Sequence, residues 1–507
     1  MILILDFGGQ YTQLIARKIR ELHVKSEIAP FDTAPDRLRA AGPQGIILSG
    51  GPASTYERGA PQLNPRLLDL GLPILGICYG MQLLARMLGG RVEPGATREF
   101  GHAQLRLIGR DRLLAGLRRT TPVWMSHGDR VEALPGGFRP IGATEDCPFA
   151  AASDPRRRLW GVQFHPEVHH TEEGRQILAN FALDICGAAP DWRMSSFVER
   201  TIEELRRSCN GRRVVCAVSG GVDSTVLAVL LHRAIGARAH PVFVDNGLLR
   251  AGEADRVIVR LRTRLGLRVK RLRAAAGCLR ALRRVTDPER KRRLIGQHFI
   301  EVFSRELRPA DLLAQGTLYP DVIESVSVKG PSATIKTHHN RVEEVLRLIG
   351  EGRVVEPLKE LFKDEVRQVG RELGLPEEFL ERHPFPGPGL AVRIIGEVTP
   401  ARLELVRRAD RILIEELRQA DLYREVWQAF CVLLPVKSVG VMGDFRTYDH
   451  VVAIRAVKSV DGMTADWAEL AKPVLGRISN RIINEVRGIN RVVYDISSKP
   501  PATIEWE

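Results

Sequence analysis

A cysteine flanked by glycines is the most reactive feature in the first part of the chain. It lies in Gly76-Ile77-Cys78-Tyr79-Gly80, between an apolar stretch typical of a strand and one typical of a helix. This is the spacing of a nucleophile elbow, G-x-S-x-G, with cysteine in place of serine. The small flanking residues permit a sharp turn, and the helix N-terminus favours the nucleophilic thiolate. An isolated cysteine is more commonly a core residue, but the elbow favours a nucleophile here.

A histidine and a glutamate further along the chain are suited to activate this thiol. His165 and Glu167 are two positions apart at the end of a strand-like run, so their side chains project from one face of an extended segment. Glu167 would then orient the imidazole and stabilise its protonated form, as the acid of a catalytic triad does. For the oxyanion hole we expect two backbone N–H groups, from Tyr79 and from Gly51.

A second reactive loop, Ser219-Gly220-Gly221-Val222-Asp223-Ser224, lies near the middle of the chain. A glycine-rich turn between a strand and a helix binds phosphate through its free N–H groups and the helix dipole. The loop is not a Walker A motif, because no lysine follows the glycines. Its serines offer hydroxyl contacts to phosphate, and Asp223 offers a carboxylate to Mg²⁺. On spacing alone, a tightly packed corner without ligand is an equally good interpretation.

Alternating strands and helices must position both segments. In the first part of the chain, apolar runs predict strands at 2–5, 45–48, 72–77, 103–108, 122–125 and 160–164. In the second part, strands at 239–244 and 311–314 follow the one that precedes Ser219, so ligands should bind at their carboxyl ends. The remainder mixes a helix at 400–419 with further strands and a helix at 476–485. These patterns predict parallel sheets covered by helices.

The predicted fold class is therefore α/β, with two doubly wound parallel-sheet domains followed by a smaller α+β domain. A chain of 507 residues is too long for one core. The helix-breaking runs at 186–190 and 383–389 mark the boundaries. We predict domains at 1–188, 189–382 and 383–507.

Composition restricts the environment and the partners. The seven cysteines are scattered without a C-x-x-C pair, which favours a reducing, cytoplasmic location, and the first residues read as a strand, not a signal peptide. No apolar run is long enough for a membrane span, so we expect no membrane partner. The formal charge of +14 is spread along the chain and aromatic residues make up only 6%, so we expect no nucleic-acid partner.

The first part of the chain resembles the class I glutamine amidotransferase family. The resemblance rests on Ser49-Gly50-Gly51-Pro52, on the cysteine elbow and on Phe164-His165-Pro166-Glu167. It implies a triad of Cys78, His165 and Glu167 that hydrolyses the side-chain amide of glutamine through a glutamyl thioester and releases ammonia. It also implies glutamine-positioning residues, which are Gln82, Ser126 and His127.

The loop 219–224 resembles the signature of N-type ATP pyrophosphatases. Further segments resemble the family of glutamine-hydrolysing GMP synthases, so that the resemblance runs from end to end; they are 243–250, 287–289, 291–293, 313–321, 335–340, 383–389 and 499–507. The resemblance implies a ligase that converts xanthosine monophosphate (XMP) to GMP through an adenylyl intermediate and cleaves ATP to AMP and pyrophosphate. The implied partners are glutamine, XMP, ATP as a substrate, Mg²⁺ and a second copy bound through the third domain, with no organic prosthetic group.

The same resemblance implies roles for individual residues. ATP would contact Ser219, Gly220, Gly221, Val222, Asp223, Ser224 and Val244, with Asp223 as the Mg²⁺ ligand and Asp321 and Glu324 as carboxylates near the metal. XMP and a lid over it would involve Arg292, Lys336, His338, His339, Lys499, Thr503 and Glu505. Two departures from the family pattern stand out. A charged run that reads as the start of a helix replaces a glycine-rich stretch after Asn340, and Arg284 stands where relatives commonly have glycine.

Two other functions compete with this interpretation. An amidotransferase-linked ATP pyrophosphatase with a different acceptor, such as a NAD synthetase, is disfavoured by the tail at 499–507 and by the third domain. A basic RNA-binding or regulatory protein with an inactive amidotransferase fold is disfavoured by the intact cysteine, histidine and glutamate.

Overall fold

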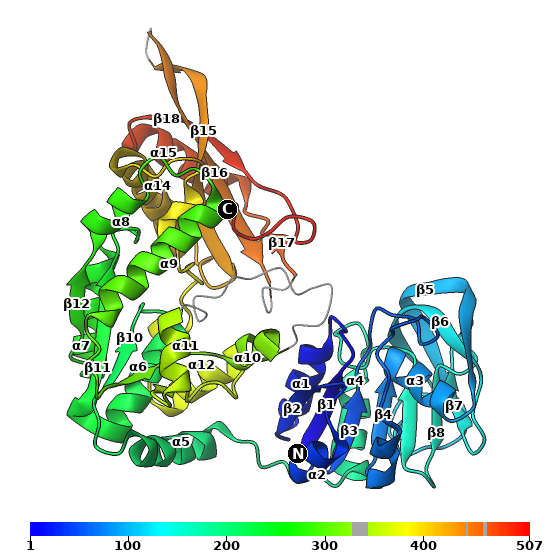
Figure 1. Ribbon diagram of the computed structural model, residues 1–507. Coiled ribbons are helices and arrows are strands. Elements are labelled where there is room, and N and C mark those ends of the chain that lie inside the picture. Colours follow the sequence, from blue (N-terminus) through cyan, green and yellow to red (C-terminus); the bar gives the residue numbers. More distant parts are fainter. Residues whose placement is uncertain (327–342, 443–444, 460–463) are drawn as a thin grey trace. The chain divides into compact units, whose positions relative to one another are not determined.

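The computed structural model describes residues 1–326, 343–442, 445–459 and 464–507. It divides into two compact units (Figure 1). The first consists of Met1–Ser196 together with helix α10 (Tyr319–Val326), and the second begins at Phe197 and contains the remaining described residues.

The first unit is built on a mixed sheet with the order β2-β1-β3-β4-β9-β8-β7-β5-β6, which makes nine strands among the described residues. From β2 to β9 neighbouring strands are parallel, and beyond β9 they are antiparallel. The strands are β1 (Ile2–Asp6), β2 (Ser26–Pro30), β3 (Gly45–Leu48), β4 (Ile74–Ile77), β5 (Arg91–Leu107), β6 (Thr120–Ala133), β7 (Arg139–Ala143), β8 (Ala151–Asp154) and β9 (Leu159–Val162). The parallel half confirms the predicted doubly wound pattern.

Helices cover this sheet because their apolar faces pack on the buried strands. In α1 the residues Ile15, Ala16 and Ile19 are buried at helical spacing. The helical segments are α1 (Thr12–Arg20), α2 (Pro35–Ala40), η1 (Pro65–Leu70), α3 (Tyr79–Met87), α4 (Gly174–Ala179) and the π-helix η2 (Asn180–Ile185). The core beneath them includes buried residues of β1, β3 and β4 such as Leu5 and Leu48.

The second unit contains a parallel sheet with the order β12-β11-β10-β13-β14, again counted over the described residues. Its strands are β10 (Val214–Ala217), β11 (Ala239–Asp245), β12 (Lys270–Arg273), β13 (Leu312–Ala314) and β14 (Val354–Val355). The accompanying helices are α5 (Met194–Cys209), α6 (Val222–Ile235), η3 (Gly236–Arg238), α7 (Glu253–Leu265), α8 (Ala275–Ala281), α9 (Pro288–Ser304), α11 (Glu343–Gly350), α12 (Lys363–Glu372) and α13 (Glu377–Leu380). Helix α11 confirms the helix predicted after Asn340.

The last part of the second unit is an α+β layer. Its elements are η5 (Gly389–Arg393), α14 (Pro400–Gln419), β15 (Gln428–Met442), β16 (Phe445–Lys458), β17 (Asp466–Trp467), α15 (Lys472–Glu485) and β18 (Ile489–Tyr494). Strand β16 pairs with β15 and β17 in antiparallel fashion and with β18 in parallel. Helix α14 has the predicted bounds, whereas α15 begins four residues before the predicted 476. The fold class expected from the sequence is thus confirmed, with its smaller α+β layer at 389–494.

Arg284 occupies a backbone conformation that explains why glycine suits this position. Its φ is +61°, in the left-handed region where a side chain is strained. The Glu397 carboxylate accepts the backbone N–H of Arg284 at 2.7 Å, which helps to hold this turn.

A buried carboxylate ties helix α14 to the turn that follows β11. Asp410 is fully buried, and its Oδ2 accepts the Arg250 guanidinium at 2.6 Å. Its Oδ1 accepts the Cys431 backbone N–H at 3.2 Å and lies 4.0 Å from the Arg393 guanidinium. Because Arg393 is also fully buried, one carboxylate balances charge from two arginines in the interior.

We therefore expect Asp410→Ala to destabilise the second unit by about 3–5 kcal/mol, because it leaves buried guanidinium charge without a partner. Thermal unfolding followed by circular dichroism measures the loss as a lower transition midpoint. The control is Glu404→Ala on the same helix, since Glu404 is exposed and lies 4.0 Å from Arg407, a pair worth about 1 kcal/mol or less. Equal effects of the two substitutions would contradict the assigned role of Asp410.

Candidate active sites

The cysteine elbow has the sharp geometry that its glycines suggested. Strand β4 ends at Ile77, helix α3 begins at Tyr79, and Cys78 between them has φ +47°. A Cβ on Gly76 would lie 2.5 Å from the backbone of Gly80, and a Cβ on Gly80 would lie 2.4 Å from the Leu48 carbonyl oxygen. The elbow therefore requires glycine on both sides of the nucleophile.

Cys78, His165 and Glu167 meet at the carboxyl end of the sheet. The Cys78 Sγ lies 3.3 Å from the His165 Nε2, and the His165 Nδ1 lies 2.7 Å from the Glu167 Oε1. The three residues are 5%, 7% and 1% exposed. The structure thus brings together the three residues that the sequence predicted as nucleophile, base and orienting acid.

Residues without any sequence signal hold the triad in place. The Thr171 hydroxyl donates to the His165 carbonyl oxygen at 2.6 Å and accepts the Trp124 backbone N–H at 3.0 Å. The ring of Tyr11 packs edge-on against the imidazole, with 5.0 Å between centroids. The Cys78 thiol also lies 2.8 Å from the carbonyl oxygen of Gln163. These contacts join segments far apart in the chain, so neither spacing nor motif indicates them.

The electrostatics of the site favour a protonated imidazole. Burial alone lowers the pKa of His165, but the negative charges of the Cys78 thiolate and the Glu167 carboxylate outweigh it. The pKa of His165 is therefore raised well above its ordinary value. A thiolate beside an imidazolium is the reactive pair that an amide-cleaving cysteine enzyme needs.

The residues predicted for the oxyanion hole lie beside the triad. A Cβ on Gly50 would lie 3.4 Å from the His165 ring, and one on Gly51 would lie 3.4 Å from the Tyr79 ring, so this glycine turn faces the elbow. The predicted glutamine contacts differ in exposure. Gln82 is buried and donates to the Asp129 carbonyl oxygen at 2.8 Å, Ser126 is exposed, and the His127 Nε2 lies 3.2 Å from the Glu99 Oε2.

The Ser219–Ser224 loop, written 219–224 below, forms a compact turn after β10. Gly220 has φ +74°, and helix α6 begins at Val222. Ser224 accepts the Ser219 backbone N–H at 3.1 Å, and the two hydroxyl oxygens are 3.1 Å apart. The loop has the strand–turn–helix form of an anion cradle, and Val244 lies near the end of the adjacent parallel strand β11.

A lysine stands beside this loop although no lysine follows its glycines. The Nζ of Lys363, the first residue of α12, lies 2.5 Å from the Asp223 Oδ2. The Asp223 Oδ1 is buried and has no hydrogen-bond partner among the described residues, so it is a fitting ligand for a cation. A Cβ on Gly316, just after β13, would lie 3.9 Å from the Asp223 Cβ, which places the end of β13 beside this carboxylate.

An arginine supports the loop from behind. The Arg382 guanidinium donates to the Gly220 carbonyl oxygen at 2.7 Å and forms an ion pair with Glu253. Burial, and secondarily the charge of Arg250, lower the pKa of Arg382 to about 10. Like Lys363, Arg382 was missed in the sequence because its position relative to the loop depends on tertiary structure.

The tail at 499–507 folds against helix α9 and the segment around η5. The Glu505 carboxylate accepts the buried Arg393 guanidinium at 2.9 and 3.2 Å, as well as the Gln428 amide at 2.8 Å. The Arg292 guanidinium donates to the Glu507 carbonyl oxygen, and the Thr503 hydroxyl donates to the Glu505 carbonyl oxygen. The structure thus brings Arg292, Thr503 and Glu505 into one region. Their roles in binding XMP remain predictions. The fourth, Lys499, pairs through its backbone with Ala465.

The remaining predicted residues lie in or beside the segment that follows helix α10. Lys336, His338 and His339 lie outside the described residues. Asp321 and Glu324 belong to helix α10.

Comparison with known proteins identifies the family. The model for glutamine amidotransferase class-I matches residues 3–185, and the model for the GMP synthase C terminal domain matches residues 415–506. A glutamine-hydrolysing GMP synthase of Nitratidesulfovibrio vulgaris (strain Miyazaki F) is 56% identical over all of this chain and 99% of its own length. Those of Chlorobium limicola and Aquifex aeolicus are 56% and 54% identical with the same coverage.

The chain belongs to the glutamine-hydrolysing GMP synthase family. As a member of this GMP synthase family it is a carbon–nitrogen ligase with a glutamine amidotransferase domain. None of the helices in the described ranges is long and apolar enough to cross a membrane. Over the same ranges, no group of three or more His, Cys, Asp or Glu residues is arranged to hold a metal ion.

Glu167→Gln should shift the alkaline limb of glutaminase activity to lower pH. Removing the carboxylate charge lowers the pKa of His165, so the protonated imidazole is lost at a lower pH as the pH rises. We also expect a roughly 10²-fold loss of kcat. Steady-state ammonia release between pH 6 and 10 tests this.

The matched control is Glu172→Gln, because Glu172 is exposed and pairs with Arg118. A pH profile that is unchanged in Glu167→Gln would remove Glu167 from its assigned role.

Proposed function

We propose that this chain converts XMP to GMP in two coupled reactions, with glutamine as nitrogen donor and ATP cleaved to AMP and pyrophosphate. The observation that carries the proposal is the triad of Cys78, His165 and Glu167 in one chain with the 219–224 loop. The triad would make ammonia, and the 219–224 loop would hold the ATP that activates the acceptor. We assign the work to three domains, 1–188, 189–382 and 383–507, in a cytoplasmic enzyme.

In the glutamine reaction, the Cys78 thiolate attacks the side-chain amide carbon. The backbone N–H groups of Tyr79 and Gly51 stabilise the negative charge that forms on the amide oxygen. The protonated His165, held by Glu167, gives its proton to the departing nitrogen, and ammonia leaves. His165 then accepts a proton from water, which attacks the thioester, releases glutamate and restores Cys78.

In the synthetase reaction, the carbonyl oxygen at C2 of XMP attacks the α-phosphorus of ATP and pyrophosphate departs. The N–H groups and hydroxyls of the 219–224 loop hold the phosphates, while Lys363 supplies positive charge beside them. Asp223 would hold Mg²⁺, which when bound neutralises phosphate charge. Ammonia then attacks C2 and displaces AMP, giving GMP.

We place XMP near the tail. Arg292 and Lys499 provide positive charge for its phosphate, while Thr503 and Glu505 border the same region. Lys336, His338 and His339 complete the proposal as lid residues. In the observed arrangement Glu505 and Arg292 already have protein partners, so binding of XMP would compete with or extend these contacts.

Replacement of the nucleophile separates the two reactions. Cys78→Ala should reduce glutamine-dependent GMP formation by roughly 10³-fold or more and leave ammonium-dependent formation near the wild-type rate. Pyrophosphate release with XMP and ATP, measured with each nitrogen donor, tests this. The matched control is Cys147→Ala, since Cys147 is a buried cysteine of the same unit to which no role is assigned. Loss of both activities in Cys78→Ala alone would overturn the division of labour.

Replacement of the loop carboxylate should stop both routes. Asp223→Asn is expected to lower GMP formation by roughly 10²-fold or more with glutamine and with ammonium alike, because both routes need the adenylylated XMP. Asp255→Asn is the control, because Asp255 is an exposed residue of α7 paired with Arg271. Full activity of Asp223→Asn with ammonium would exclude Asp223 from the ATP site.

We also propose that two copies associate through the end of the β15–β16 hairpin, which we call the hairpin arm (436–442 and 445–449). The arm projects from its layer (Figure 1). It carries apolar side chains that are largely exposed: Val436, Val439, Val441, Phe445 and Tyr448. A group of exposed apolar residues on one element is a usual sign of a protein interface.

Val441→Glu combined with Phe445→Glu should convert the dimer to a monomer, because it introduces two charges into an apolar contact. Sedimentation velocity measures the mass. Ile349→Glu on α11 controls for adding charge at an exposed apolar position elsewhere. A dimer that persists in the arm variant would place the interface elsewhere.

A further inference from the structure

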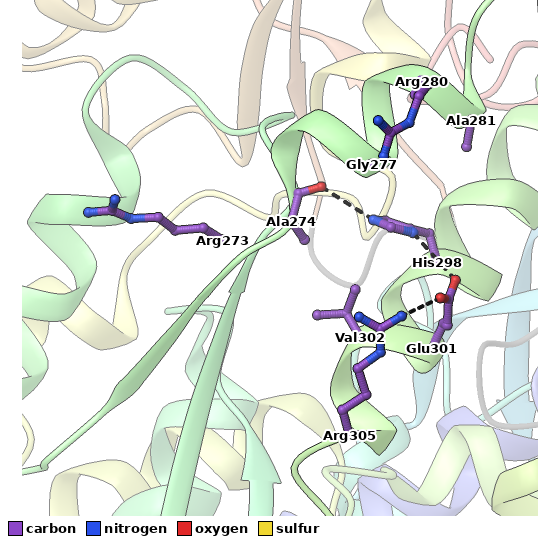
Figure 2. Close-up of a pocket in the computed structure, with 9 residues that line it drawn as sticks. All are labelled: Arg273, Ala274, Gly277, Arg280, Ala281, His298, Glu301, Val302 and Arg305. Carbon is purple, nitrogen blue, oxygen red and sulfur yellow. Dashed lines mark hydrogen bonds and ion pairs between the residues drawn. The ribbon is translucent and has the colours of Figure 1, made fainter.

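A pocket that no step above uses lies between helices α8 and α9. Its volume is about 540 Å³, within the range of small-molecule sites. It is lined by Arg273, Ala274, Gly277, Arg280, Ala281, His298, Glu301, Val302 and Arg305 (Figure 2). We call it the α8–α9 pocket.

The pocket is formed by two helix faces. His298, Glu301 and Val302 lie on one face of α9, and Arg305, the residue that caps its C-terminal end, continues the same i, i+3, i+4, i+7 spacing. On the opposite side, a Cβ on Gly277 would lie 2.6 Å from the His298 ring, so glycine lets the imidazole approach α8. The His298 Nε2 lies 3.3 Å from the carbonyl oxygen of Ala274, which connects the two sides of the pocket.

The charges of the pocket are not balanced. Its one carboxylate, Glu301, lies 2.6 Å from the Arg305 guanidinium and 3.8 Å from His298. No side-chain hydrogen bond or ion pair involves Arg273 or Arg280 within the described part of the chain. Figure 2 shows Arg280 and Arg305 on opposite sides of His298 and Arg273 extending to one side. Because the Arg273 side chain extends away from the other lining residues, the Arg280 guanidinium is the charge that remains available to an anion in this pocket.

We propose that the α8–α9 pocket binds a phosphate-bearing small molecule, with Arg280 as its main phosphate contact. A guanidinium matches phosphate geometry with two parallel hydrogen bonds. Ala281 and Val302 add apolar side chains to the lining, which suits the sugar or base of a mononucleotide. This site is separate from the 219–224 loop and from the tail at 499–507.

A ligand in the α8–α9 pocket could influence ATP binding, because α8 packs on the turn that follows strand β11. The Ala274 backbone N–H donates to the Asp245 carbonyl oxygen at 2.8 Å, at the end of β11. A Cβ on Gly247 would lie 2.6 Å from the Ala275 Cβ, so the start of α8 packs directly on the turn after β11. A ligand that orders α8 would therefore stabilise the turn that follows Val244, the predicted adenine contact.

Hydrogen–deuterium exchange of the full chain locates binding directly. The probes are inorganic phosphate, ribose 5-phosphate, AMP and GMP at low millimolar concentration. We expect slower exchange in peptides covering 274–281 and 298–305. Stronger protection by AMP or GMP than by phosphate identifies a nucleotide site, and equal protection identifies a phosphate site. Absence of protection by all four probes would overturn the proposal.

Charge variants separate this site from the ATP loop. Arg280→Ala and Ala281→Glu should require at least about tenfold more ligand for the same protection, because one removes a charge-assisted hydrogen bond and the other adds a repelling charge. Ala281→Gln, of similar size but neutral, and Arg283→Ala, an exposed arginine outside the pocket, should bind as wild type.

GMP formation without added effector should persist in all four variants, which shows that they are folded. If the ligand still slowed exchange equally well in both Arg280→Ala and Ala281→Glu, its binding site would be the ATP site. That result would contradict the proposal. If only a short RNA, and none of the four small probes, slowed exchange in these peptides, the surface would bind nucleic acid. That result would also contradict the proposal.

Discussion

Both reactive segments depend on one constraint, the sharp corner where a parallel strand turns directly into a helix. At such a corner the first N–H groups of the helix have no backbone partner, and they point at whatever lies beyond the strand. The chain reverses within a few residues, so the backbone must adopt left-handed conformations such as φ +47° at Cys78 and +74° at Gly220. The same geometry positions the Cys78 side chain in one unit and the proposed phosphate-binding loop in the other.

Each corner works only because other segments support it. Behind Cys78, the buried His165 and Glu167 form a charged relay, and Thr171 fixes the backbone that carries the imidazole. Behind the 219–224 loop, Arg382 holds the Gly220 carbonyl oxygen and Lys363 pairs with Asp223. The loop that lacks a lysine of its own thus obtains one from α12, which reconciles its sequence with the positive charge that phosphate transfer requires.

The second unit buries several charged side chains in the region proposed to bind a nucleotide. Arg393 is fully buried against the rings of Phe385 and Phe430, and its charge is shared between Glu505 and Asp410. Such pairs contribute little net stability compared with apolar packing, but they fix the geometry of the groups that they join. They hold the 383–389 segment, helix α14 and the tail at 499–507 in one arrangement.

Much of the fold and of the chemistry could be read from short stretches of sequence. The triad, the loop and the parallel strands are encoded by contiguous residues, since a turn between glycines and a buried apolar run depend on local sterics and burial. The antiparallel strands β5 and β6 were predicted only in part, because long half-exposed strands carry weak apolar patterns.

The amino-acid sequence by itself determined which groups react and the family to which they belong, because those signals are local. Tertiary structure alone decided which groups surround them. Lys363, Arg382 and Thr171 acquire their contacts from neighbours far away in the chain. A charged residue looks the same in sequence whether it meets solvent, a carboxylate or a phosphate. Only folding sets the distances on which electrostatic interactions depend.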